Sequence, residues 1–453
     1  MQKVSIFWFR RDLRLQDNAG LHAALKSGNP VLPLFVFDRE ILDDLEDKKD
    51  ARVSFLHNTL SEMKEALEAE HGSSLLVRYG YPVEVLKALL TEYDIAAVYT
   101  NRDYEPYAKE RDGLAEELLS QNGVPFHTFK DHVIFEAEEV CKKDGGTYTV
   151  FTPYSRTWRA RLQDRTSTVE DDNGQTTEIS YHFEPYPVKA YAQHFLKSQP
   201  LPMPTLADMG FEPSTIDIPS ATVSRGLIKN YDKTRDIPSV QGTSRLGIHF
   251  RFGTISIREK ARRALQLNQT FLNELIWRDF YSQILDQHPH VASRSFRPKY
   301  DHIAWRNDPA EFQRWCEGKT GYPIVDAGMR ELNTTGYMHN RVRMITASFL
   351  TKHLLIDWRW GEAYFAKKLL DFDLASNNGG WQWAAGSGTD AAPYFRVFNP
   401  YSQQKKFDKE FKYIKQWVPE FGTDAYPQPM VEHKMARERC LSSYKEGLAK
   451  SEA

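Results

Sequence analysis

The chain has 453 residues, of which 41% are hydrophobic and 26% charged, and its formal net charge is −2. This length suggests two or three domains, and the composition is that of an ordinary globular protein. No run of about 20 apolar residues occurs, so the sequence predicts no membrane span. The start of the chain lacks the pattern of a secretory signal peptide, and the expected location is cytoplasmic.

The cysteine and histidine content argues against a disulfide framework and a metal enzyme. Cys141, Cys316 and Cys440 lie far apart, and the histidines show no ligand spacing. A net charge near zero neither indicates nor excludes nucleic acid as a partner, because DNA binding needs only a local basic face.

The first 131 residues alternate between strand-like and helix-like patterns. Apolar runs occur at Val4–Phe9, Val31–Phe37, Ser74–Tyr79, Ala96–Tyr99 and Pro125–Phe129, and amphipathic stretches occur at Ala51–His71, Pro82–Tyr93 and Glu105–Gln121. Buried strands separated by helices predict a doubly wound parallel α/β sheet, whose ligands bind at the carboxyl ends of strands. Neither a GxGxxG nor a Walker loop is present, so the common phosphate-binding motifs are missing.

The rest of the chain changes character twice. Prolines interrupt residues 132–200, which we expect to form an interdomain connection with limited regular structure. Residues 201–453 are expected to form an all-α domain. Its helix candidates are Ile255–Leu267, Phe271–Leu285, Pro309–Gly318, Tyr322–Thr334, Arg341–Leu355 and Trp360–Leu370.

Two stretches of this helical part carry polar groups in patterns that suit a ligand. Thr243, Ser244 and Arg245 precede a helix, where hydroxyls, backbone N–H groups and an arginine suit a diphosphate. A helix N-cap beside an arginine ion pair explains the same residues. Glu274 and Trp277, with Arg278, share a helix face that could hold a base and its phosphate. The alternative is an ordinary Glu274–Arg278 pair beside a tryptophan.

A third stretch, Asp371 to Trp383, combines aspartates and asparagines with the paired glycines Gly379 and Gly380. This composition does not indicate a core helix. The glycines allow close approach to a ligand, and the carboxylates and amides suit a flat heterocycle such as a flavin ring. A capped loop between helices is the alternative, and no calcium-loop spacing is present.

Longer segments of the sequence match a known pattern. These segments are WFRRDLR at Trp8, TSRL at Thr243, NELIWR at Asn273, EGKTGYPIVDAGMR at Glu317, MHNRVRM at Met338 and DFDLASNNGGWQW at Asp371. With them the chain resembles the photolyase/cryptochrome family over most of its length, and bacterial cyclobutane pyrimidine dimer photolyases above all. The resemblance implies FAD in the helical domain and light-driven repair of pyrimidine dimers by electron transfer from photoexcited, reduced FAD.

The resemblance also implies residue roles. FAD would be held by Tyr231, Thr243, Ser244, Arg245, Leu246, Gly247, Phe271, Arg278, Arg343, Asp371, Phe372, Asp373 and Asn377. The lesion would be contacted by Glu274, Trp277, Asn340, Met344 and Trp383, and the DNA phosphates by Arg235, Arg341, Arg396, Gln403 and Lys406. Trp381, Trp358 and Trp305 would form an electron relay to the surface, although three core tryptophans explain the same spacing.

The sequence departs from the family pattern at several positions. Gly247 stands where a serine is frequent, and Phe271 where relatives often have tryptophan. Tyr107 and Ala108 occupy the places of an Asn-Glu pair that holds a folate antenna in many bacterial relatives. A second chromophore, if bound, is therefore expected to be of the deazaflavin or flavin type rather than folate.

The sequence leaves three alternatives to a dimer photolyase. A cryptochrome, which is a signalling photoreceptor, shares the scaffold, but Asn377, Glu274 and Met344 favour repair. A (6-4) photolyase would be expected to carry more histidines near His339. A light-independent nucleotide-binding enzyme of the α/β type would leave the C-terminal motifs unexplained. The expected partner is DNA containing pyrimidine dimers, and the expected state is a monomer.

Overall fold

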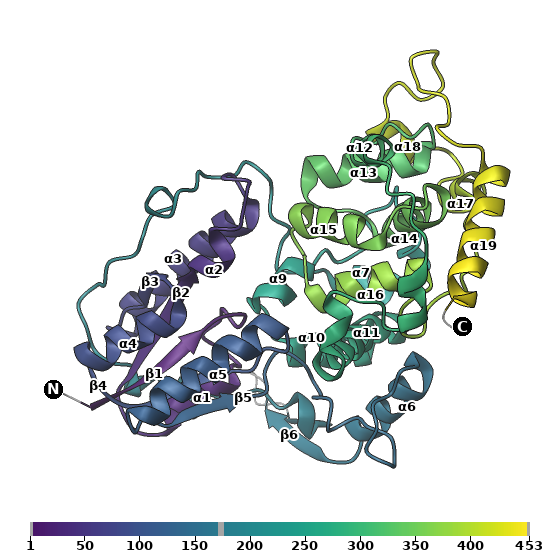
Figure 1. Cartoon of the computed structure of the whole chain (residues 1–453). Helices are drawn as coiled ribbons and strands as arrows, with labels where there is room; N and C mark the ends of the chain where they lie inside the picture. The colour runs from purple at the N-terminus through teal and green to yellow at the C-terminus, as the bar shows by residue number, and fades with distance from the viewer. Residues whose placement is uncertain (1–2, 171–175, 451–453) are drawn as a thin grey trace. The chain divides into compact units, whose positions relative to one another are not determined.

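The computed structural model describes residues 3–170 and 176–450 (Figure 1). The chain forms two compact units whose sequence segments interleave. Unit 1 comprises Met1–Glu139, Trp158–Ala221 and Leu246–Arg263, and unit 2 comprises Val140–Thr157, Thr222–Arg245 and Ala264–Ala453.

Unit 1 is built on a parallel sheet with the strand order β3-β2-β1-β4-β5. The strands are β1 (Lys3–Phe9), β2 (Val31–Asp38), β3 (Leu76–Gly80), β4 (Asp94–Asn101) and β5 (Phe126–Phe129). In β1, Trp8 lies opposite Leu34 of β2 and Thr100 of β4. The central strands are buried on both faces, as their continuous apolar runs require in a helix-covered sheet.

Helices cover both faces of this sheet, which confirms the doubly wound α/β fold. On one face, α1 (Ala19–Lys26) and α3 (Ala51–His71) pack with the core of Phe7 and Phe35. On the other, α4 (Pro82–Glu92) and α5 (Pro106–Gln121) pack with Ile6 and Trp8. The short helices α2 (Arg39–Leu42) and α9 (Gly247–Phe252) complete the unit, and α10 (Ile257–Leu267) begins in it.

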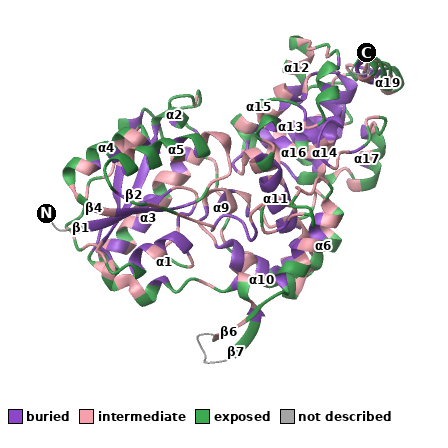
Figure 2. Cartoon of the chain, turned by 60° about the horizontal axis from the view of Figure 1, so that its bottom comes forward, coloured by how far each residue is buried: buried purple, intermediate pink, exposed green. Residues whose placement is uncertain are grey.

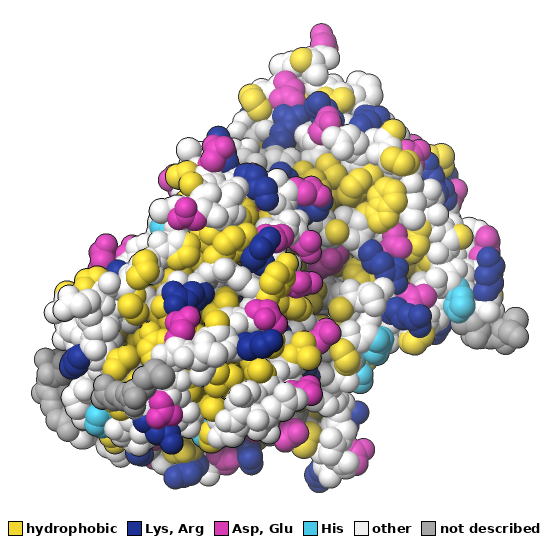
Figure 3. Space-filling view, turned by 60° about the vertical axis from the view of Figure 1, so that its left-hand side comes forward, with side chains coloured by type: hydrophobic (Ala, Val, Ile, Leu, Met, Phe, Trp, Pro, Cys, Tyr) yellow, Lys and Arg dark blue, Asp and Glu magenta, His cyan; other side chains and the backbone are white. Residues whose placement is uncertain are grey.

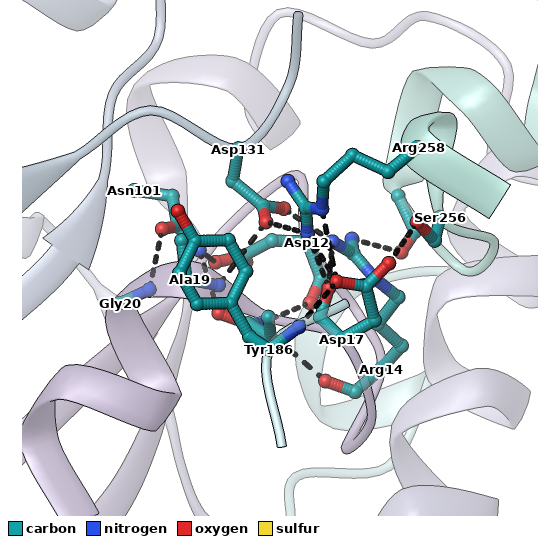
Figure 4. Close-up of polar contacts among 12 residues, drawn as sticks. Asp12, Arg14, Asp17, Ala19, Gly20, Asn101, Asp131, Tyr186, Ser256 and Arg258 are labelled. Carbon is teal, nitrogen blue, oxygen red and sulfur yellow. Dashed lines mark hydrogen bonds and ion pairs between the residues drawn. The ribbon is translucent and has the colours of Figure 1, made fainter. Parts of the chain in front are cut away.

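A buried polar cluster fixes the loop between β1 and α1 (Figure 4). Asp131, whose side chain is 1% exposed, accepts from Arg14 at 2.5 Å and from Arg258 at 2.8 Å. Arg258 also donates to the Asp17 carboxylate at 2.9 Å. Burial raises the pKa of Asp131, but the two arginines outweigh burial and hold that pKa below its usual range.

Residues 132–200 contain more regular structure than the sequence predicted, and that expectation was wrong. Helix α6 spans Phe151–Leu162, and β6 (Thr166–Glu170) pairs antiparallel with β7 (Thr176–Ser180). The prolines that prompted the expectation, from Pro185 onward, all follow β7. They restrict only the later part of the segment, where the 3-10 turn η2 (Val188–His194) forms. Two other 3-10 turns, η1 (Tyr181–Phe183) and η3 (Ala207–Met209), lie before and after these prolines.

Unit 2 is helical, as predicted. Its helices are α7 (Arg225–Lys229), α8 (Tyr231–Thr234), α11 (Gln269–Gln287), α12 (Pro309–Cys316), α13 (Pro323–Thr335), α14 (Asn340–Ser348), α15 (Trp358–Lys368), α16 (Leu374–Ala385), α17 (Pro400–Phe407), α18 (Lys412–Trp417) and α19 (His433–Ala449). A π-helical turn, Phe349–His353, continues α14. Buried residues concentrate along α13, α14 and α16 (Figure 2).

Helix α16 corrects the expectation that Asp371 to Trp383 does not form a core helix. Asp373 caps α16 by accepting from the Ser376 N–H at 3.1 Å. At Gly379, a Cβ atom would lie 2.2 Å from the Tyr281 ring of α11. Packing against α11 therefore overrides the low helix propensity of asparagine and glycine. The glycines were predicted to allow close approach to a ligand, but Gly379 instead allows close approach to the Tyr281 side chain.

No helix in the described part of the chain is long and apolar enough to cross a membrane. On the face drawn in Figure 3, basic and acidic side chains are interspersed.

Removing the carboxylate of Asp131 tests the cluster of Figure 4. In Asp131→Asn, two buried guanidinium groups lose their shared anion, and we expect the free energy of unfolding to fall by about 3 kcal/mol. Urea unfolding followed by circular dichroism measures the loss. The control is Glu212→Gln, which removes the Lys49 pair, whose side chains are 64% and 66% exposed. It should cost less than about 0.5 kcal/mol. Equal losses in the two variants would contradict a central role for the cluster.

Candidate active site

A cavity of about 400 Å³ opens in unit 2. It brings together half of the predicted site residues, including every residue expected to contact the lesion: Arg235, Glu274, Trp277, Arg278, Asn340, Arg343, Met344, Asp371, Phe372, Asp373, Asn377, Trp381 and Trp383. Five further lining residues were not predicted, namely Tyr281, Ala347, Phe365, Leu369 and Ser376. Gly380, one of the paired glycines expected near a ligand, also lines the cavity.

Helix α11 supplies one wall of the cavity. Its N-cap Asn268 fixes the start of the helix, and Glu274 and Trp277 follow on successive turns. Glu274 forms an ion pair with Arg235. Burial raises the pKa of the Glu274 carboxyl above its usual range, and Arg235 offsets this only in part. Glu274 therefore retains a proton to higher pH than an exposed glutamate does.

Helix α14 and the start of α16 supply a second wall. Arg343 donates to Asp371 Oδ2 at 2.9 Å and to the Met338 carbonyl at 2.7 Å. The other carboxylate oxygen, Asp371 Oδ1, is buried and accepts no hydrogen bond from the described residues. A buried acceptor without a donor is costly, so this oxygen suits a ligand that presents an N–H group.

Glu362 is a residue of this site that sequence reasoning missed. Asn377 donates to Glu362 Oε1 at 2.8 Å and to the Glu362 carbonyl at 3.1 Å. Burial raises the pKa of Glu362, and the hydrogen bond from Asn377 offsets part of that rise. The sequence signal that could have pointed to Glu362 was helical spacing, since Glu362 follows Trp358 by four residues and the two share a face of α15.

Tyr337, also missed, links the stretch predicted to bind diphosphate to Arg343. Its hydroxyl lies 2.9 Å from Thr243 Oγ1. The guanidinium groups of Arg245 and Arg343 lie over its ring, 4.4 and 5.6 Å from the centroid. Ser244 is half-buried. The last two residues of the stretch belong to unit 1, where Leu246 is buried and Gly247 begins α9.

The remaining predicted residues do not line the cavity. They are Tyr231, Thr243, Ser244, Arg245, Leu246, Gly247, Phe271, Trp305, Trp358, Arg341, Arg396, Gln403 and Lys406. Tyr231 and Phe271 pack edge to face at 5.1 Å. Arg341 pairs with Asp236 at 2.6 Å, and the exposed Arg396 accepts at its carbonyl from the buried Lys352 at 2.9 Å.

The three tryptophans of the predicted relay differ in burial. Trp381 lines the cavity and is buried, and its ring lies 6.0 Å from that of Trp315. Trp358 is buried, whereas Trp305 is half-buried and contacts Tyr444 at 5.9 Å. The relay itself stays a prediction.

A larger cavity, of about 660 Å³, lies in unit 1. Arg14, Asp17 and Ser256 line it, but they hydrogen-bond within the cluster of Figure 4. Its His249 bonds to the Pro219 carbonyl and to Thr254, both at 2.7 Å. These four polar side chains of the cavity are therefore already engaged within unit 1.

The unit 2 cavity suits a planar heterocycle that carries N–H donors and carbonyl acceptors. Aromatic planes are available at Trp277, Trp381 and Trp383, an acceptor at Asp371 and a cation at Arg343. Within residues 3–170 and 176–450, no group of three or more His, Cys, Asp or Glu could hold a metal ion.

Comparison with known proteins decides the family. Residues 5–171 match the family model described as DNA photolyase, and residues 271–423 match the FAD binding domain of DNA photolyase. The chain is 38% identical to the deoxyribodipyrimidine photo-lyase of Halobacterium salinarum, over 97% of this chain and 98% of that protein. The protein belongs to the DNA photolyase family.

Solved structures agree with this assignment. An archaeal photolyase from Sulfolobus tokodaii, solved with two FAD molecules, covers 98% of this chain and 100% of its own at 34% identity and a TM-score of 0.79. A Synechocystis cryptochrome covers 98% of this chain and 99% of its own at 25% identity and a TM-score of 0.82. The fold is shared by both kinds of protein, so the function must be argued from the site.

The family assignment identifies FAD as the cofactor of unit 2, and the cavity fits it. Asp371 Oδ1 and Arg343 offer an acceptor and a donor, and Asn377 adds an amide beside the buried Glu362 carboxyl. Thr243 and Arg245, joined to Arg343 through Tyr337, suit the phosphate end of the cofactor.

Replacing the amide of Asn377 tests its expected place beside the flavin. In Asn377→Asp, two carboxyl groups would lie within hydrogen-bond distance, and they would share a proton until the pH rises enough to ionise both. Two negative charges then disfavour an anionic, reduced flavin. We expect the flavin midpoint potential of the variant to fall below that of the parent, increasingly so as pH rises, and repair to decrease. Spectroelectrochemical titration measures the potential.

Glu362→Gln in the same variant is the control for Asn377→Asp. It removes one of the two ionisable carboxyl groups, so the difference in flavin midpoint potential from the parent should depend less on pH. A variant with the potential of the parent at every pH would show that Asn377 does not act on the flavin.

Proposed function

We propose that this protein uses light absorbed by FAD to repair cyclobutane pyrimidine dimers in DNA. The observation that carries the proposal is the single cavity shared by predicted lesion-side and flavin-side residues. Glu274, Trp277 and Met344 line the same space as Asp371 and Asn377. Its similarity to relatives that are deoxyribodipyrimidine photo-lyases, such as that of Halobacterium salinarum, supports the proposal.

The residues of this cavity would recognise the dimer by stacking and hydrogen bonding. The lesion must leave the duplex, as in other photolyases, which costs a few kcal/mol and less for a distorted base. Stacking on Trp277 and Trp383 returns about 1–3 kcal/mol per base. The Glu274 carboxylate can accept a hydrogen bond from the edge of a pyrimidine.

Bound and reduced FAD would supply one photoexcited electron, which splits the cyclobutane ring and returns. The residues of the chain would position the flavin for this electron transfer. Asn377 and Glu362 fix the hydrogen bonding beside the ring, and Arg343 fixes Asp371. Asn340, the exposed first residue of α14, would face the lesion.

Cations at the cavity and around it would hold the DNA backbone. Arg396 and Lys406 are exposed, and Gln403 is half-buried beside Lys406 on α17. Arg235 and Arg341 are paired with Glu274 and Asp236, so they would exchange a carboxylate for a phosphate on binding. Such contacts give affinity without sequence preference.

A blue-light signalling role is the second candidate, because a cryptochrome shares this fold. The lesion-side residues favour repair instead. Glu274, Asn340 and Met344 line the cavity together with two tryptophans that could stack on bases.

A repair assay tests the proposed function. The purified protein with FAD bound and photoreduced should, under blue light, restore DNA that contains dimers. Binding to that DNA should weaken by orders of magnitude between about 50 and 200 mM salt, because each phosphate contact releases counterions. Absence of light-dependent repair by the FAD-loaded protein would reject the assignment, and a flat salt response would reject the phosphate contacts.

The antenna prediction concerns the start of α5. Tyr107 donates to Asp38 at 2.6 Å, and Ala108 is 3% exposed and carries no polar group. These side chains offer no free carboxylate for a pterin edge, so we expect no tightly bound methenyltetrahydrofolate. Acid extraction after reconstitution with excess folate should yield FAD and little pterin. Near-stoichiometric pterin would show this expectation to be wrong. A flavin-type second chromophore accords with the two FAD molecules of the Sulfolobus structure.

A further inference from the structure

The first turn of α6 packs against a tryptophan of the cavity. The rings of Phe151 and Trp277 lie face to face, with centroids 3.7 Å apart and planes inclined by 3°. Trp277 lines the cavity, whereas Phe151 is not among its lining residues. Phe151 therefore covers one face of the indole, and Trp277 contributes part of its remaining surface to the cavity.

The segment that carries Phe151 is held by the loop after α16. The Phe151 N–H donates to Asp390 Oδ2 at 3.2 Å, and Thr389 Oγ1 donates to the Thr149 carbonyl at 2.6 Å. This loop follows directly on the helix that carries Trp383. Phe151 is thus held by the loop that follows α16, the helix of Trp383, which is the other tryptophan expected to stack on the lesion.

Two further rings restrict Trp277 from α11 itself. Phe280 meets it edge to face at 5.5 Å, and Tyr281 lies at 5.4 Å with a 31° tilt. With one face covered by Phe151 and two further rings in contact, the indole is held in place while part of its surface lines the cavity. A side chain already held in one rotamer loses less entropy when a ligand stacks on it.

We propose that Phe151 is a positioning residue for the damaged base, since it holds the Trp277 ring in the plane on which an unstacked pyrimidine dimer stacks. This inference rests on the proposed repair function. Phe151 does not touch the lesion and acts only through Trp277. It should therefore influence how tightly a dimer is held, and not the chemistry of a dimer already bound.

The test compares Phe151→Leu, which keeps apolar bulk but removes the ring, with Phe151→Tyr, which keeps the ring. Phe151→Leu should raise the Kd for an oligonucleotide with one dimer about 3- to 10-fold. The Kd for intact DNA and the salt dependence of binding should not change. Repair per absorbed photon at saturating DNA should equal that of the parent. Phe151→Tyr should restore the Kd to within about twofold.

Phe312→Leu is the matched control. Phe312 stacks on Trp315 with centroids 5.8 Å apart, and neither residue lines the cavity. Its loss should leave the Kd for dimer DNA unchanged. If Phe151→Leu loses FAD, Phe151→Met fills a similar volume and carries the same expectations.

The outcomes separate this inference from the proposed function. A parent protein that neither prefers nor repairs dimer DNA would refute the repair function. If the parent does both and Phe151→Leu binds dimer DNA equally well, only the role of Phe151 is refuted. Equal weakening for damaged and intact DNA, or no rescue by Phe151→Tyr, would likewise refute it and indicate a general structural role.

Discussion

Two glycines, Gly361 and Gly379, allow α11, α15 and α16 to pack closely, and the cavity depends on that packing. A Cβ atom on Gly361 of α15 would lie 2.1 Å from the Trp381 ring, and one on Gly379 of α16 would lie 2.2 Å from Tyr281. Real Cβ atoms do not approach other atoms so closely, so any other residue would push the helices apart. The positions of Trp381 and Asn377 on α16, and with them two walls of the cavity, follow from these contacts.

The buried charges of the two units are used differently. In unit 1, Asp131 is saturated, because Arg14 and Arg258 bind its carboxylate and the Ala19 N–H donates to it at 3.2 Å. That arrangement serves stability, since each buried charge has a partner. In unit 2, Asp371 has one oxygen bound by Arg343 and one without a donor among the described residues. A buried acceptor without a donor indicates a site where a ligand supplies the missing hydrogen bond.

The aromatic residues around the cavity form layers. Trp277 lines the cavity and stacks on the ring of Phe151, and Tyr281 contacts both Trp277 and the backbone of α16 at Gly379. Stacking on a flat, sequence-independent surface suits the recognition of a damaged base by its shape. The same layering includes α6, which lies outside the region that the sequence pattern predicts to be the helical domain.

The sequence determined much of this molecule by itself, through signals that are local. Continuous apolar runs predicted the parallel strands, and 3.6-residue periodicity predicted α3, α11 and α13, because burial of a strand or a helix face leaves its own spacing. The family motifs named many of the residues that line the cavity.

Tertiary structure alone decided the rest. Asn377 meets Glu362 from a neighbouring helix, Thr243 meets Tyr337 across 94 residues, and Phe151 meets Trp277 from a segment expected to be a connection. Even the helical state of α16 depends on packing, since asparagine and glycine favour a loop and contacts with neighbouring helices, such as Gly379 with Tyr281, reverse that preference. Contacts between segments distant in sequence leave no periodic signal in one chain, because they are set by how whole helices pack and not by the spacing within any one of them.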